Sequence, residues 1–317
     1  MVLREQAPVG GLLAVHAHPD DETLSNGALL ATWAAAGLPV TVVTCTRGER
    51  GEVIPAGLAH LEGDGPALAA HREHELAAAL AALGVTDHVF LDQVPGPGGA
   101  QPGARRFVDS GMAWAGAGRA TAADDVDADA FVRVPLDDAA GRLAAVLRAR
   151  RPAVVVGYEP GGGYGHPDHV RAHEVLHRAV ALAAAHEDGA GTGAAPWHVP
   201  VVLWTVLQEQ EWRAGLAQLR AGATGLPVAS DTAVPSAVRP GPVDVRVPVA
   251  PVLDRVLAAL AAHRTQVHAL GREAGGPAVA RFALSNDVLH PVLADETYLV
   301  AAGRPEDVRW PAAVVLT

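Results

Sequence analysis

Two short stretches of the chain carry residue types that could hold a metal ion and activate water. Residues 16–22 have the sequence HAHPDDE, and residues 161–169 have the sequence GGGYGHPDH. His18 and Asp21 are three positions apart on an expected tight turn, so their side chains can converge on one zinc ion, which takes nitrogen and oxygen ligands. Asp20 lies between them and is expected to face a bound water, because a catalytic zinc keeps one position open.

The second stretch contains the candidate for a third ligand. We predict that His169, at the start of a helix, completes a site of two histidines and one carboxylate. Tyr164 and His166 would flank the open position, and Asp168 would orient His166 or a ligand. The predicted cofactor is one zinc ion per chain, with iron(II) as the alternative, because two nitrogens and a carboxylate suit both metals.

Each stretch also has an interpretation without a metal. An aspartate at a helix start is a good N-cap, and Glu22 in the first turn suits the helix dipole. The second stretch could be a glycine-rich turn with incidental histidines, or a loop that binds phosphate at a helix N-terminus. However, N-capping needs neither a histidine nor two adjacent carboxylates, and neither phosphate-binding fingerprint occurs where it would be needed.

Other catalytic patterns do not fit the chain. It contains no G-x-S-x-G elbow, and residues 71–75, HREHE, lack the H-E-x-x-H order of a metalloprotease helix. Arg72 could reach a substrate, whereas its neighbours are expected on a solvated helix face. Cys45 is expected inside a strand, as a packed apolar residue and not a nucleophile.

Alternating strands and helices must position these residues. Buried strands are predicted at residues 12–17, 40–46, 88–91 and 153–158, and helices at 22–36, 67–83 and 136–150. This alternation predicts an α/β fold with a mostly parallel sheet covered by helices on both faces. Both motif stretches follow a strand, so they should share the edge of the sheet where open α/β folds bind ligands.

The rest of the chain is interpreted as one long loop, one linker and an extension of the sheet. Residues 93–134 are rich in Gly, Pro and Asp and too long for an ordinary connection, and residues 187–196 form a Gly/Ala linker. The final third is predicted to contain strands at 199–207, 243–249 and 298–301 and helices at 212–221 and 252–270. A single domain over residues 1–317 is the simplest account.

Composition narrows the classes of protein to consider. The formal net charge of −11 disfavours nucleic-acid binding, which depends on Lys and Arg. Cys45 is the one cysteine, so no intrachain disulfide can form and a reducing cytosol is expected. No apolar run reaches the roughly 18 residues of a membrane span, and the first residues lack a signal-peptide core. We therefore expect a soluble cytoplasmic protein that does not engage membranes.

The motifs together resemble a known family. HPDDE at 18–22, a Val-rich strand running into TRGE at 46–49, and HPDH at 166–169 are similar to the PIG-L/LmbE-like N-acetylglucosaminyl deacetylases. The resemblance implies a Rossmann-like fold, with zinc held by His18, Asp21 and His169. It covers the catalytic core and reaches the C-terminal region, but is weak across residues 95–106 and 187–196, which we interpret as local insertions.

The resemblance also implies roles for other residues. Asp20 would be the general base, and Tyr164 and His166 would stabilise the oxyanion and assist the leaving amine. Arg72 and Asp109 match positions that hold substrate hydroxyls. Residues 1–186 would form the metal-binding core, and residues 197–317 would complete the substrate pocket. Whether Asp20 or His166 protonates the amine stays open.

Further segments narrow the resemblance. LSNG at 24–27, RGEV at 50–53, DSGM at 109–112, GGYGH at 162–166 and FALSN at 282–286 resemble the branch that deacetylates N-acetylglucosaminyl-inositol in mycothiol biosynthesis. The implied partner is a small amino-sugar substrate. The alternatives are an amidase acting on mycothiol S-conjugates, a deacetylase of another amino sugar, and a metal-free carbohydrate-binding protein. Residues 23–27 favour the deacetylase over the amidase, and Asp20 argues against a pure binding protein.

Overall fold

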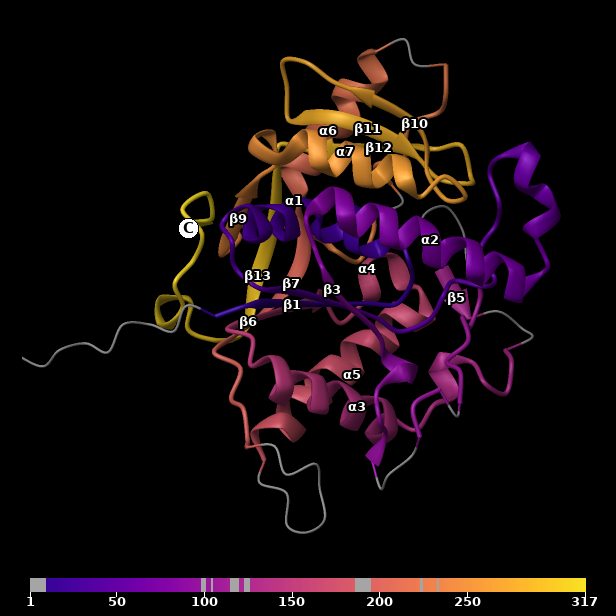
Figure 1. The fold of residues 1–317 in the computed structure, drawn as a ribbon. Helices are drawn as coiled ribbons and strands as arrows, with labels where there is room; N and C mark the ends of the chain where they lie inside the picture. The colour runs from indigo at the N-terminus through magenta and orange to yellow at the C-terminus, as the bar shows by residue number, and fades with distance from the viewer. Residues whose placement is uncertain are drawn as a thin grey trace, which may run out of the picture.

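A nine-stranded sheet with helices on both faces forms the body of the protein (Figure 1). The computed structural model describes residues 10–97, 101–103, 105–114, 120–122, 126–185, 195–222, 225–232 and 234–317. The α/β fold with a mostly parallel sheet is therefore as predicted. The predicted linker at 187–196 lies almost wholly outside the described residues, as do parts of the stretch 93–134.

The strands of the main sheet follow the order β14-β9-β13-β7-β6-β1-β2-β3, with β8 paired to β7. Their bounds are β1 Leu12–His16, β2 Val40–Thr44, β3 Asp87–Phe90, β6 Val154–Tyr158, β7 Val201–Gln208, β8 Val238–Arg239, β9 Val245–Pro248, β13 Asp295–Gly303 and β14 Val315–Leu316. The run β3-β2-β1-β6-β7 is parallel, whereas β13, β9 and β14 each run antiparallel to a neighbour. The expected C-terminal extension of the sheet is thus an antiparallel one.

Two hydrophobic clusters hold the helices on the two faces of this sheet. The helices are α1 Asp21–Ala35, α2 Gly65–Leu83, α3 Leu136–Arg150, α4 Gly162–Gly165, α5 Pro167–Ala184, α6 Glu209–Ala221 and α7 Leu253–Ala262. Helices α1, α2 and α7 lie on one face of the sheet, and α3 and α5 lie on the other (Figure 1). Their buried side chains form one hydrophobic cluster on each face. The valines of the central strands contribute to both clusters, as expected for parallel strands buried on both sides.

The ends of α2 show how local sequence sets the bounds of an element. The Asp64 side chain accepts the Ala67 N–H at the N-terminus, which is ordinary N-capping. Gly84 ends the helix in the left-handed conformation, with φ of 86°, where a residue without Cβ is favoured. The sequence predicted this stop, and it also predicted the bounds of α3.

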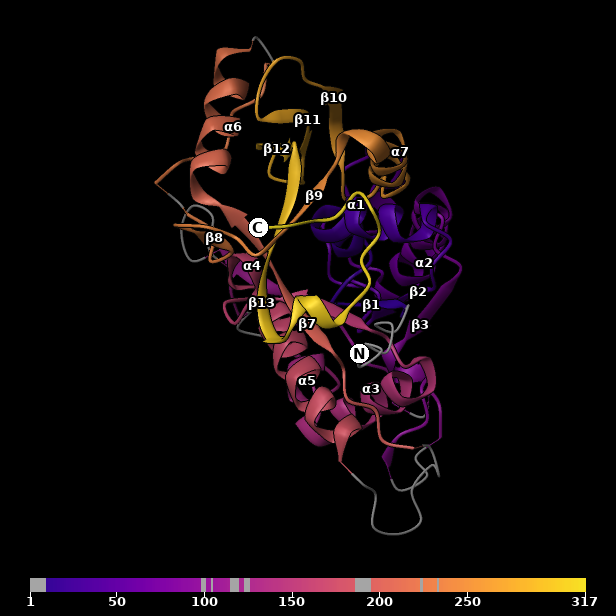
Figure 2. The same ribbon diagram turned by 90° about the vertical axis from the view of Figure 1, so that its left-hand side faces the viewer.

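A second, three-stranded antiparallel sheet lies near α6 and corrects one prediction. It consists of β10 His268–Arg272, β11 Ala278–Ala283 and β12 Leu289–Leu293, and α6 packs against it (Figure 2). The helix predicted over residues 252–270 is therefore wrong in its second half: α7 ends at Ala262, and β10 pairs with β11 instead. Pairing with the next strand along the chain, in an antiparallel hairpin, outweighed the helical composition of this segment.

Shorter elements fill the connections. The 3₁₀ turns are η1 Ala56–Leu61, η2 Leu91–Gln93, η4 Phe131–Arg133, η5 Ala250–Val252 and η6 Pro305–Asp307. A ribbon of β4 Met112–Trp114 and β5 Ala120–Ala122 lies within the long stretch that the sequence marked as irregular. Within the described part of the chain, no helix is long and apolar enough to cross a membrane.

Helix α1 is interrupted at Asn26, where φ is −140° and ψ is 15°. The side-chain amide of Asn26 donates to the Tyr298 hydroxyl on β13. The backbone N–H groups of Ala28 and Leu29, which begin the second half of the helix, donate to the Glu296 carboxylate at 2.7 and 2.8 Å. A carboxylate suits a helix N-terminus because the free N–H groups there are partly positive. The C-terminal strands thus support the helix that follows the first motif.

Candidate active site

The two predicted motifs lie at the point where the strand order of the parallel sheet reverses. Strand β1 has β2 on one side and β6 on the other. The chain therefore continues from β1 to β2 in one direction along the sheet and from β6 to β7 in the opposite direction. Residues 18–22, here named the HPDDE turn, follow β1, and residues 159–166, here named the glycine turn, follow β6. Such a switch point opens a crevice for ligands at the carboxyl ends of the strands.

The three predicted ligands present atoms at nearly equal spacing. Nδ1 of His18 lies 3.3 Å from Oδ2 of Asp21 and 3.3 Å from Nε2 of His169. Nε2 of His169 lies 3.3 Å from Oδ1 of Asp21. Bonds of about 2.0–2.1 Å at tetrahedral angles would place zinc ligands roughly 3.3–3.4 Å apart. The donor set and its spacing therefore fit a small divalent metal ion.

The far nitrogen of His18 has its own carboxylate partners. Nε2 of His18 lies 3.3 Å from Oδ2 of Asp168 and 3.5 Å from Oδ1 of Asp109. Ser110 fixes Asp168 by donating both its N–H and its hydroxyl to this carboxylate. A carboxylate behind a histidine is the usual way to fix the tautomer and ring orientation of a metal ligand. Of the two roles predicted for Asp168, this geometry supports orientation of a ligand.

Asp20 occupies a backbone conformation that a residue with a side chain rarely adopts, with φ of 112° and ψ of −35°. Its side chain forms no N-capping hydrogen bond, so the capping interpretation of this aspartate does not hold. Its backbone N–H donates to Oε2 of Glu22 at 2.9 Å, and Oδ2 accepts from Nη2 of Arg72 at 3.1 Å. Glu22 in the first turn of α1 thus holds the Asp20 backbone, and Arg72 of α2 contacts its carboxylate.

Tyr164 and His166 stand next to the ligand His169. The rings of His166 and His169 are stacked with centroids 4.9 Å apart, and Tyr164 lies edge-on to His169 at 5.1 Å. Nδ1 of His166 accepts the Asp168 N–H, so a neutral His166 ring carries its proton on Nε2. The structure thus brings both residues to the cluster of predicted metal ligands.

Arg72 and Asp109 also reach the cluster, although they come from distant segments. The Arg72 guanidinium is buried and donates to the carbonyl oxygens of Gly48 and Pro19 as well as to Asp20. Asp109 accepts the N–H groups of Arg50 and Gly111 and faces His18. Both residues therefore orient the chain's own groups in addition to any contact with a substrate.

Similarity to known proteins identifies the family of this chain. Residues 13–180 match the family model described as PIG-L, GlcNAc-PI de-N-acetylase. The chain belongs to the PIG-L family. A protein of Kineococcus radiotolerans is 46% identical over 93% of this chain and 79% of its own length. A protein of Streptomyces avermitilis is 44% identical over 92% of both chains. Both relatives are named 1D-myo-inositol 2-acetamido-2-deoxy-alpha-D-glucopyranoside deacetylase.

A solved structure of a conserved protein from Thermus thermophilus is also similar to this PIG-L family chain. It is 24% identical, covers 80% of this chain and 79% of its own, and has a TM-score of 0.45. Among the curated relatives, the shared name is that of a deacetylase. The family assignment thus places the chain among deacetylases.

Burial and neighbouring charges shift the pKa values of several groups in the buried cluster of this PIG-L family protein. Burial disfavours the charged form of His18, but Asp109, Asp168 and Asp21 outweigh it and raise the pKa of His18 well above its usual value. Burial likewise opposes ionisation of Asp21, yet the two histidines hold the pKa of Asp21 well below its usual value. Burial raises the pKa of Asp20 to about 6, although Arg72 opposes this shift. These groups form a preorganised electrostatic site.

Several residues in and around the cluster were not predicted from the sequence to take part in the site itself. Glu22 is fully buried and bonds to the turn itself, whereas the sequence suggested only a favourable charge in the first helical turn. Tyr158 stacks on His169 with ring centroids 4.3 Å apart. Glu49 accepts the Asp109 N–H and so fixes the loop that carries Asp109. Cys45 is buried just after β2, which supports the packing role predicted for it.

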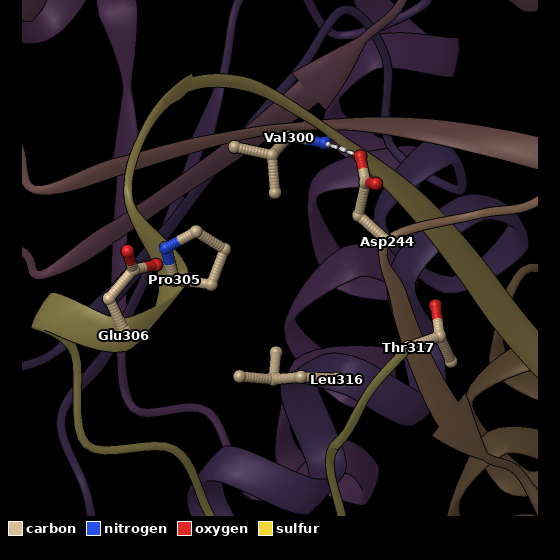
Figure 3. Close-up of a pocket in the computed structure, with 6 residues that line it drawn as sticks. All are labelled: Asp244, Val300, Pro305, Glu306, Leu316 and Thr317. Atoms are coloured by element: carbon tan, nitrogen blue, oxygen red, sulfur yellow. Dashed lines mark hydrogen bonds between the residues drawn. The ribbon is translucent and has the colours of Figure 1, made fainter.

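A pocket of about 480 Å³ lies elsewhere, beside the antiparallel edge of the main sheet (Figure 3). Its lining consists of Asp244, Val300, Pro305, Glu306, Leu316 and Thr317. The Val300 N–H donates to the Asp244 carboxylate across one wall. These side chains offer no nitrogen ligand and none belongs to either motif, so we place the chemistry at the switch point and not in this pocket.

Proposed function

We propose that this chain is a divalent-metal-dependent hydrolase that removes the acetyl group from N-acetylglucosaminyl-inositol. The observation that carries the proposal is the set of 3.3 Å spacings among His18, Asp21 and His169. The names of relatives that are 46% and 44% identical over nearly the whole chain support the substrate. Zinc is the proposed metal and iron(II) the alternative.

The proposed roles follow from what each side chain can reach. Lewis-acid polarisation of the acetyl carbonyl and a more acidic water are what a divalent metal supplies when bound by these ligands. Asp20 accepts the proton of the attacking water, for which its carboxylate is held beside the ligands by Arg72. The Tyr164 hydroxyl and the Nε2–H of His166 stabilise the oxyanion, and His166 or Asp20 returns a proton to the leaving amine.

We further propose that residues 197–317 complete the substrate pocket of a core formed by residues 1–186. Two contacts support this division of labour. His263 bonds to Glu22 of the HPDDE turn at 2.8 Å, and Arg239 bonds to Glu159 of the glycine turn at 3.1 Å. Both motif turns therefore contact the C-terminal part, as expected if this part forms one side of the substrate pocket. Arg72 and Asp109 are proposed to contact the hydroxyls of the sugar.

The decisive experiment measures metal content and acetate release together. Purified protein should contain close to one divalent metal per chain and release acetate from N-acetylglucosaminyl-inositol. The His169→Ala variant should lose both, whereas His74→Ala, which removes an exposed histidine of α2, should lose neither. Full metal content and full activity in His169→Ala would contradict the ligand assignment.

Competing substrates separate the alternatives within the family. A mycothiol S-conjugate cleaved faster than N-acetylglucosaminyl-inositol would identify an amidase. Faster acetate release from another N-acetyl amino sugar would identify a different deacetylase. Sugar binding without acetate release by the metal-loaded protein would favour a binding protein.

A further inference from the structure

The conformation of Asp20 needs support from outside its own turn. Its φ of 112° and ψ of −35° lie outside the regions favoured for residues with a Cβ. Such conformations persist only where the surrounding structure imposes them, and they gather at functional sites. Asp20 is one of four described non-glycine residues with positive φ, and the one of them that lies between two candidate metal ligands.

The Glu22 carboxylate supplies the closest support. Its Oε2 accepts the backbone N–H of Asp20 at 2.9 Å, which fixes the strained peptide directly. Its Oε1 accepts the Thr23 hydroxyl and Nε2–H of His263, the latter at 2.8 Å. Glu22 is fully buried, and a buried carboxylate keeps one orientation only if its oxygens are all satisfied by donors. The donors on His263 and Thr23 together hold Oε1, and this fixes the direction in which Oε2 points; of the two, only His263 comes from a distant segment.

His263 is itself held by contacts of α7 and α2. Of these two helices, only α2 carries a predicted site residue, Arg72. His263 is fully buried at the C-terminus of α7, where carbonyl groups favour a donor or a cation. The turn that follows it is fastened to α2, because Thr265 donates both its N–H and its hydroxyl to Glu75. The Ile54 N–H in turn donates to the Thr265 carbonyl. His263 thus connects the C-terminal part to Glu22, 241 positions away in the sequence, and through Glu22 to Asp20.

We propose that His263 is a positioning residue for Asp20. Its Nε2–H orients Glu22, Glu22 holds the Asp20 peptide, and the Asp20 carboxylate is thereby kept beside the metal ligands. His263 contacts none of the ligand atoms and takes no part in proton transfer. The proposal rests on the proposed function in one respect, which is that Asp20 acts as the base.

A matched pair of variants tests the hydrogen bond separately from packing. His263→Gln can place an amide N–H close to the position of Nε2, whereas His263→Asn reaches only the position of Nδ1, and both remove the ring. We expect His263→Asn to lower kcat by about 10²-fold, the scale of a misplaced catalytic group, with a much smaller change in KM and full metal content. His263→Gln should recover most of the kcat. Equal losses in the two variants would overturn the proposal.

Hydrogen exchange measured by mass spectrometry provides a readout that needs no substrate. Amides of residues 17–23 should exchange faster in His263→Asn than in the wild type or in His263→Gln, with α3 unchanged in all three. Unchanged exchange of this segment in His263→Asn would overturn the proposal. If the wild type released no acetate, the proposed function would fail while the exchange result would still decide whether His263 holds the turn.

A second variant covers the case in which His263→Asn does not fold. Glu22→Gln keeps the volume of the side chain and leaves His263 in place. Its single amide oxygen can serve Asp20 or His263 but not both in the present geometry. The same loss of kcat and the same faster exchange at residues 17–23 are expected, and wild-type values for both would contradict the proposal.

Discussion

The HPDDE turn and the glycine turn follow adjacent strands and meet at one site, yet they are built in opposite ways. The HPDDE turn places its strained φ at Asp20, whose side chain is the proposed base, and buried side chains hold it there. The glycine turn places positive φ at Gly162, Gly163 and Gly165, where no Cβ resists it. A carboxylate that must point in one direction needs a held backbone, whereas the glycine turn obtains its shape from residues that adopt it freely.

The two histidines proposed as metal ligands are also supported in different ways. Nε2 of His18 faces the carboxylates of Asp168 and Asp109. Nδ1 of His169 is buried and has no hydrogen-bond partner among the described residues. The glycine turn is instead held through its backbone, because Glu159 accepts the N–H groups of Gly161 and Gly163. The comparison predicts that loss of the Asp20 carboxylate will damage the function of the first turn, whereas an added Cβ or the loss of the Glu159 carboxylate will damage the backbone of the second.

The largest loss of activity is expected from a change of the Asp20 side chain in the HPDDE turn. Asp20→Asn should lower kcat by about 10²–10⁴-fold, because an amide cannot accept the proton of the attacking water. Metal content should stay near that of the wild type, since the ligands are unchanged. Acetate release and metal analysis on the same preparation provide the measurement. Normal turnover in this variant would refute the role of Asp20 as base.

Two glycine substitutions test the backbone of the second turn. At Gly162, a Cβ would lie 2.7 Å from the Val170 nitrogen, so Gly162→Ala must displace the start of α5 and with it His169. At Gly163 the nearest atom to an added Cβ, Nδ1 of His169, is 3.9 Å away, so Gly163→Ala adds backbone strain alone, about 1–3 kcal/mol. We expect weaker metal binding and lower activity for Gly162→Ala than for Gly163→Ala. The reverse order, measured by metal titration and acetate release, would contradict the proposed clash.

Loss of the Glu159 carboxylate, which holds the glycine turn, should lower the free energy of unfolding more than loss of its basic partner, Arg239. Glu159→Gln replaces one acceptor oxygen by an NH₂ group, so a partly buried backbone N–H loses its partner, at about 1 kcal/mol of unfolding free energy. Arg239→Ala removes a side chain that is 41% exposed, for which about 0–1 kcal/mol is expected. Denaturant unfolding of both variants measures this. A larger loss in Arg239→Ala would show that the ion pair, not the backbone contact, holds the turn.

The smallest effect concerns the helix after the HPDDE turn. Burial raises the pKa of Glu296 to about 7 from the usual 4.5. The folded state therefore binds this proton more tightly than the unfolded state, so the contribution to stability is complete below pH 4.5 and is lost as the pH rises to about 7. Because the side chain keeps some solvent exposure, we expect a decline of the order of 1 kcal/mol. Unfolding free energies at pH 5 and pH 7 measure it.

The Glu296→Gln variant isolates this contribution from other titrating groups. A glutamine does not titrate, so the difference in unfolding free energy between pH 5 and pH 7 should be smaller in Glu296→Gln than in the wild type. The same pH dependence in both proteins would show that Glu296 is already ionised in the folded state. In that case the N–H groups of Ala28 and Leu29 donate to an ionised Glu296 carboxylate, as in ordinary helix capping.

Local patterns in the sequence were sufficient to predict the central elements and to place the two motifs on one edge of the sheet. Helix α3 occupies the predicted residues, and both motif stretches follow parallel strands that are neighbours in the sheet. Carboxyl ends of parallel strands share one edge, so His18, Asp21 and His169 were predicted on the same edge of the sheet. That β1 and β6 are neighbours, which brings these residues together, is seen only in the fold. The period and end signals that reveal such elements depend on residues only a few positions apart.

What the tertiary structure alone decided is how this site is held. The helix predicted over residues 252–270 ends at Ala262, because its last residues pair as β10 and His263 bonds to Glu22. The positive φ of Asp20 and the bonds of both turns to the C-terminal part likewise arise from contacts between distant segments. No pattern within one segment encodes such contacts. The sequence by itself determined which residues could do the chemistry, and long-range packing determined their geometry, because burial and hydrogen bonding select one arrangement only after the segments have come together.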